Sequence, residues 1–156
     1  MKKFTLFFIF FYFIFNIEGN AKTTRLKGIN EVDLLIESLN GSAAEKCSIT
    51  EKQIETTVKY VLSNSKIKLS ENPSDPLLYI KVIVINDGTA CSVYSSITVE
   101  TFTDAPFNSG NRGRFIYYKN DRISSGGINS GIGKFVLDKI EEMMKELVIR
   151  HPEDNL

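Results

Sequence analysis

The chain has 156 residues, 42% of them hydrophobic, and its 19 basic residues are balanced by 19 acidic ones. A formal net charge of zero gives no general attraction to nucleic acid or to an anionic membrane, so we expect no nucleic-acid partner. A single histidine cannot build a His-rich metal site, and we expect neither a metal nor a cofactor.

Residues 1–21 have the features of a secretory signal peptide. Lys2-Lys3 precedes an apolar run over 4–15, and Gly19-Asn20-Ala21 offers small residues for cleavage after residue 21. The apolar run spans about 12 residues, short of the ~20 that cross a bilayer as a helix. We therefore expect export to the periplasm or the cell exterior, with no membrane span after leader removal. The alternative is an uncleaved membrane anchor.

After the leader we expect a flexible N-terminal arm over 22–29, a single domain over 30–151 and a short C-terminal tail over 152–156. Apolar and polar residues alternate over 30–39, which predicts a half-buried strand. Thr50 and Gln53 then form a capping-box pattern. The apolar residues that follow recur at helical spacing, so we expect a helix over 50–64.

The second half of the chain reads as a meander of strands followed by a helix. We expect a short strand at 66–69, strands over 77–85, 91–103 and 114–120, and a hairpin turn at Asn86-Asp87-Gly88. Residues 104–113 and 121–129 read as loops. A final apolar stripe predicts a helix over 130–150, which Pro152 should end.

The resulting order is β-α-β-β-β-α. We predict an α+β fold with one mostly antiparallel sheet and two helices on one face. The layout resembles that of small uncharacterised exported bacterial α+β proteins. The resemblance rests on the Thr50 helix, the 77–82 strand and a closing helix that ends in His151-Pro152. The resemblance implies no activity and no site residues.

Cys47 and Cys91 fall at the same end of this predicted topology. In an oxidising compartment they would form a disulfide. The alternative is two separate thiols, one of them buried.

The segments that look like catalytic motifs each lack residues that the motif requires. The Gly-rich stretch 126–134 lacks the glycine and the hydroxyl residue that a phosphate-binding P-loop needs, because Ile128 and Phe135 hold those positions. Ser63 and Lys66 match Ser-x-x-Lys, but the partner motifs of that enzyme class are missing. His151 lies at a helix end, where we expect it to face the helix dipole or solvent. An enzyme is therefore the least favoured function.

Two surfaces are candidates for a function. Strand 77–85 is apolar on both faces, so the face away from the helices needs a cover: either a protein partner or homodimer, or the N-terminal arm or the 104–113 loop folding over it. The second candidate surface is the edge of the domain where both predicted helices begin, because helix N-termini favour anions. The candidate interface residues are Leu77, Tyr79, Ile83, Ile85 and Tyr94, and the candidate loop contacts are Phe107, Arg112 and Arg114.

Two functions follow from these surfaces. The first is a non-enzymatic interaction module that associates with itself or docks on an envelope or secreted partner. The alternative is a protein that binds a small anion or metabolite at the edge where the helices begin.

Overall fold

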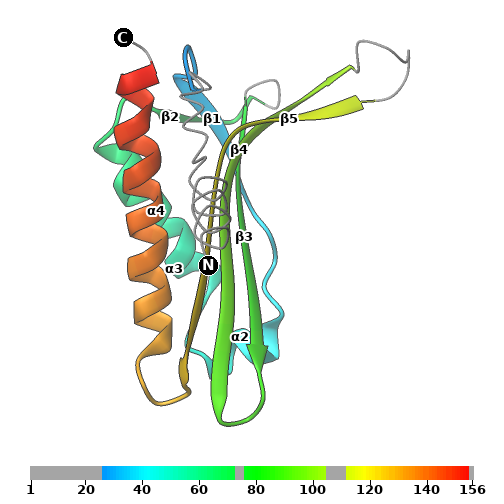
Figure 1. Ribbon diagram of the computed structural model, residues 1–156, viewed down its shortest axis with the longest axis vertical. Coiled ribbons are helices and arrows are strands. Elements are labelled where there is room, and N and C mark those ends of the chain that lie inside the picture. Colours follow the sequence, from blue (N-terminus) through cyan, green and yellow to red (C-terminus); the bar gives the residue numbers. More distant parts are fainter. Residues whose placement is uncertain (1–25, 73–75, 105–111, 155–156) are drawn as a thin grey trace, which may run out of the picture.

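The computed structural model describes residues 26–72, 76–104 and 112–154 (Figure 1). The predicted signal peptide and Phe107 lie outside the described residues. The chain forms an α+β fold, as predicted. Its elements are β1 (Glu31–Ile36), α2 (Gly41–Lys46), α3 (Glu51–Ser63), β2 (Lys68–Ser70), β3 (Leu77–Asn86), β4 (Ala90–Asp104), β5 (Arg112–Gly127) and α4 (Ile132–Asp154).

The strands make one mixed sheet in the order β2-β1-β3-β4-β5. β1 pairs in parallel with both β2 and β3, while β3, β4 and β5 form an antiparallel meander. The antiparallel pairings are the long ones: β3 and β4 stay in register from Leu77↔Glu100 to Asn86↔Cys91. The sheet therefore combines a long antiparallel half with a short parallel half.

The two long helices, α3 and α4, lie side by side on one face of the sheet (Figure 1). Alternation along β3 turns Leu78, Ile80, Val82 and Val84 toward them, and all four are buried. Each helix packs an apolar stripe against this face of the sheet. In α4 the buried residues of the stripe are Val136, Ile140, Met143, Met144 and Leu147. Among the described elements, neither α3 nor α4 covers the other face of the sheet, which we call the open face.

The start of α3 confirms the capping box. The Thr50 hydroxyl accepts a hydrogen bond from Gln53 N–H (3.3 Å), and the Gln53 side chain accepts one from Thr50 N–H (2.9 Å). Two backbone donors at the helix start are thus satisfied by the local sequence. The helix runs to Ser63, close to the predicted end.

The packed body begins before residue 30. Leu26 and Ile29 are buried in the core, although they belong to the segment expected to form a flexible arm. His151 is also buried, 3% exposed, and its Nε2 donates to the Ile29 carbonyl oxygen at 2.5 Å. Of the two alternatives for His151, exposure to solvent is therefore wrong, while the residue does lie in the last turn of α4. The histidine fastens the end of α4 to the N-terminal segment.

Two element ends differ from the predictions. β5 continues to Gly127 instead of ending at residue 120, because β4 offers it a pairing partner as far as Ala90↔Gly127. Cross-strand pairing outweighs the Ser/Gly-rich composition there. α4 runs to Asp154, two residues beyond Pro152, which is within the one or two positions by which assigned helix ends vary.

A disulfide joins Cys47, in the connection between α2 and α3, to Cys91 at the start of β4, with the two Cα atoms 6.0 Å apart. Both cysteines are fully buried. The predicted disulfide is therefore present. The start of α4 lies against the same connection: a Cβ on Gly133 would stand 2.4 Å from the Ser48 carbonyl oxygen. Only glycine allows this approach, so α4 is held at the disulfide.

Removing the disulfide should lower the free energy of unfolding substantially. The cysteines are 44 residues apart in sequence, and in the chain-entropy account a loop of that size is worth about 4 kcal/mol. A Cys47→Ala/Cys91→Ala variant, measured by urea titration, should lose stability of that order. Equal stability of the variant and the oxidised protein would show that the crosslink constrains little of the unfolded chain.

Gly133→Ala should cost about 1–3 kcal/mol, as overpacking in a tight core does. The added methyl meets backbone atoms of Cys47 and Ser48, which cannot rotate away. Gly41→Ala is the matched control, since nothing lies within 4 Å of its Cβ position. It should change stability by no more than about 0.5 kcal/mol. Equal effects of the two substitutions would contradict the close approach at Gly133.

Candidate functional site

The open face of the sheet, turned away from α3 and α4, carries a small cluster of apolar side chains. Ile83 of β3 pairs with Tyr94 of β4, which in turn pairs with Ile123 of β5, so the three lie in one row across the strands. Ile85 lies beside them on β3. Ile83, Ile85 and Ile123 are 42%, 65% and 82% exposed. We call these four residues the apolar patch.

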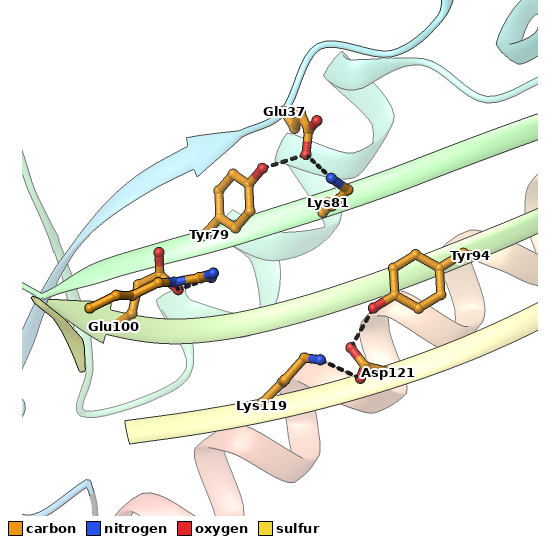
Figure 2. A network of polar contacts seen from close by, with 8 residues as sticks. Glu37, Tyr79, Lys81, Tyr94, Glu100, Lys119 and Asp121 are labelled. Carbon is orange, nitrogen blue, oxygen red and sulfur yellow. Dashed lines mark hydrogen bonds and ion pairs between the residues drawn. The ribbon is translucent and has the colours of Figure 1, made fainter. Parts of the chain in front are cut away.

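Next to the apolar patch, the residue that follows β1, Glu37, contacts two polar side chains of β3. The Tyr79 hydroxyl donates a hydrogen bond to Glu37, and Lys81 Nζ lies 3.2 Å from the same carboxylate (Figure 2). This hydrogen bond lowers the pKa of Glu37 and raises the pKa of Tyr79 to about 12. Glu37 is thus a charged acceptor fixed between two donors, and Tyr79 is a neutral phenol at every physiological pH.

A second polar group spans β4 and β5. The Tyr94 hydroxyl donates to Asp121 Oδ1 at 2.9 Å, and Lys119 Nζ lies 2.9 Å from Asp121 Oδ2 (Figure 2). Hydrogen bonds from Ser96, Lys119 and Tyr94 outweigh the burial that opposes them, so the pKa of Asp121 is lowered. Tyr94 therefore presents its ring to the apolar patch while its hydroxyl is held by the neighbouring strand.

The third group contains a buried charge. Glu100 is 3% exposed, and Arg114 donates to it through Nε at 2.7 Å and through a second guanidinium nitrogen. A buried carboxylate needs such a partner, because an unpaired charge is costly to remove from water. The pair lies where β4 and β5 slip register between Val99 and Glu100. Arg114, a predicted loop contact, is therefore a partner of this carboxylate within the sheet.

Beyond Glu100, β4 pairs with β5 alone, because the last β3 pairing in the described chain is Leu77↔Glu100. Figure 1 shows this two-stranded ribbon curving away from the rest of the sheet. It exposes Phe102 (55%) and Phe115 (60%). Arg112 pairs with Asp104 at its described end. The ribbon thus places aromatic side chains in solvent on both of its faces.

The structure assembles the predicted interface in part. Ile83, Ile85 and Tyr94 lie together, while Leu77 and Tyr79 share their face but are less exposed. Sequence reasoning missed Ile123, because residues 121–129 read as a loop. Residues 117–123 show no alternation of apolar and polar side chains, so the sequence has no local signal for this extension of the strand. The described part of the predicted arm, residues 26–29, packs in the core beside α4 and does not lie over the apolar patch.

The geometry at the helix starts gives no support to the anion-binding alternative. The first turn of α3 is capped by its own residues, and Glu51 in that turn accepts a hydrogen bond from Leu39 N–H at 2.9 Å. The shallow depression beside it is lined by three carboxylates, those of Glu45, Glu51 and Glu55, against the one lysine, Lys52. At α4, the Cys47 and Ser48 carbonyl oxygens lie against Gly133. Carboxylates therefore surround the start of α3, and backbone atoms crowd the start of α4.

Two features are absent from the described residues. Within 26–72, 76–104 and 112–154, no three His, Cys, Asp or Glu side chains gather as metal ligands. In the same part of the chain no helix is both long and apolar enough to cross a membrane.

Comparison with known proteins gives little similarity. No family model matches the chain, and no curated protein matches it. Among solved structures, a minor lipoprotein from Acinetobacter baumannii aligns with 80% of this chain and 91% of its own, at 12% identity and a TM-score of 0.35. Similarity at that level carries no argument about this chain, so its function has to be inferred from its own residues.

The Glu37–Tyr79 contact should be visible in an alkaline titration. The folded protein raises the pKa of Tyr79 from 10.0 to about 12, so it favours the neutral phenol. The resulting stabilisation is complete below pH 10 and is lost as the pH rises toward 12. The difference in tyrosinate absorbance between wild type and Tyr79→Phe reports this pKa. Glu37→Gln should move it back toward 10, and no change in that variant would exclude the hydrogen bond as its cause.

Proposed function

We propose that the protein is a non-enzymatic interaction module, exported to the periplasm or the cell exterior, that binds another protein through the open face of its sheet. The observation that carries the proposal is the apolar patch. Three isoleucines, Ile83, Ile85 and Ile123, are exposed side by side with the Tyr94 ring on three hydrogen-bonded strands. Single exposed apolar residues are ordinary, whereas a contiguous group of this kind marks a binding surface.

The arrangement around the apolar patch supports this reading. Interfaces have an apolar centre that loses its water and a polar rim that stays solvated. Here Lys81 and Glu37 border the patch on one side, and Asp121 and Lys119 border it on another. Their charges are balanced, so the surface suits a partner with an apolar centre and does not require a strongly charged one.

The rigidity of the patch also supports binding. The strands that carry these side chains are hydrogen-bonded to one another across the patch, and Asp121 holds the Tyr94 hydroxyl in place. A preorganised surface loses less conformational entropy when it binds. The same hydrogen bonds favour binding over catalysis, because three acids of this face, Glu37, Glu100 and Asp121, are each committed to a neighbouring donor.

Export is supported by the disulfide. Cys47 and Cys91 are bonded, and structural disulfides form and persist in oxidising compartments outside the cytoplasm. The composition of residues 1–21 points the same way.

Site-specific photocrosslinking in producing cells tests the proposed face. A photoreactive amino acid at Ile85, which is exposed and stands on β3, should give a discrete adduct with one other protein. The control position is Tyr60. Its side chain is 62% exposed, but it stands on α3, on the opposite side of the sheet from the apolar patch. Substituting lysine at Ile83 should abolish the Ile85 adduct, because a charge would replace an apolar contact.

Adducts of equal yield from Ile85 and Tyr60 would contradict a specific face. An adduct from Ile85 with twice the mass of the chain would also contradict the proposal, because the open face would then bind a second copy of this protein.

A further inference from the structure

A second surface is independent of the open face: the free edge of β5. β5 is an edge strand of the sheet, paired with β4 on one side. Within the described chain no strand pairs with its other side. It is long, from Arg112 to Gly127, and contains no proline. Proteins protect or pair such edges, because a row of unpaired backbone groups is a template for another strand.

The backbone groups that face this edge can be identified. The Ile128 N–H donates to the Thr89 carbonyl oxygen at 3.1 Å, which sets the phase of the ladder between β4 and β5. In an antiparallel pair, residues alternate between bonding to the partner strand and turning their N–H and C=O away. Following the register back from Ile128, Lys119, Asp121 and Ile123 turn these groups outward.

We propose that two copies of this chain pair antiparallel through their β5 edges, about a two-fold axis at Asn120, so that their sheets become continuous. In this register Lys119 of each copy stands opposite Asp121 of the other, and both residues present outward backbone donors and acceptors. At these positions the two strands therefore form backbone hydrogen bonds, and their side chains bring opposite charges together.

The charge pattern selects this register over its neighbours. The phase of the ladder requires the axis to pass through a residue, so that outward-facing residues meet outward-facing ones. An axis at Lys119 would set lysine against lysine, and an axis at Asp121 would set aspartate against aspartate. Of these three registers, only the one centred on Asn120 pairs opposite charges. A self-complementary edge is what an isologous dimer requires.

The side chains around this segment fit an edge that is open to a second strand. Lys119 and Asp121 are 50% and 38% exposed, and they form an ion pair along their own strand in the single chain (Figure 2). On the other face, Asn120 donates to Glu146 of α4 at 2.7 Å, and α4 contacts both β4 and β5, so the helix lies inward of the free edge. The open face is left uncovered by this dimer, so the inference does not rest on the proposed function.

Two charge variants test the pairing. Asp121→Lys has lysine at both positions, and Lys119→Asp has aspartate at both. Each alone should dimerise more weakly than wild type, with a dissociation constant raised about tenfold or more, because like charges then face each other twice. Mixed in equal amounts, the two variants should form a heterodimer, since every cross-strand pair is again of opposite charge. Sedimentation equilibrium of the purified proteins measures both.

The mixture separates pairing from damage to the fold. Both variants lose the ion pair within the strand, and circular dichroism shows whether each remains folded; a misfolded variant would not recover in the mixture. The exchanged variant Lys119→Asp/Asp121→Lys keeps both the ion pair and the cross-strand pattern, so it should dimerise like wild type.

The proposal is overturned if wild type remains monomeric at the highest concentration reached, or if mixing fails to restore association of two folded variants. It is also overturned if the folded exchanged variant is monomeric. None of these three results would affect the Ile85 adduct, which reports on the open face of the sheet at β3.

Discussion

The architecture depends on one crowded point, where the connection between α2 and α3 meets both the sheet and the last helix. The Cys47–Cys91 bond fixes that connection to the first residues of β4. On its other side, the carbonyl oxygens of Cys47 and Ser48 press on Gly133 at the start of α4. Ser48 adopts a left-handed backbone, φ 58°, to make this turn. The starts of both long helices and the β3–β4 hairpin are thereby held together, and the whole helical layer stays on one face.

Much of this could be predicted from local patterns. The capping box at Thr50, the alternation of β3 and the stripe of α4 each contain their own signal, because a helix start and an amphipathic period are properties of neighbouring residues. The disulfide followed from chain direction. What failed depends on partners distant in sequence. Gly126 and Gly127 are in a strand because β4 pairs with them, and Leu26 and His151 are buried because the segment before β1 packs against the end of α4.

The candidate site was predictable in the same limited sense. Ile83, Ile85 and Tyr94 could be assigned to one face, since side chains on a strand alternate. Their neighbour Ile123 could not, because its place in the patch requires knowledge of the β4–β5 register. The polar partners were equally out of reach. Glu37 and Tyr79 are 42 residues apart, and only the parallel pairing of β1 with β3 brings them together.

That position of β1 has a consequence for how the chain folds. β1 is the first strand, yet it lies inside the sheet between β2 and β3, and its partners Leu77 to Ile80 come more than forty residues later. The β3–β4–β5 meander, by contrast, joins segments that are adjacent in sequence, and a hairpin closes quickly. We expect the meander to form first, as a platform on one edge of which β1 and β2 must dock. Until then its β3 edge is as open as the β5 edge, so a nascent or refolding chain has two edges at which it can pair with its neighbours.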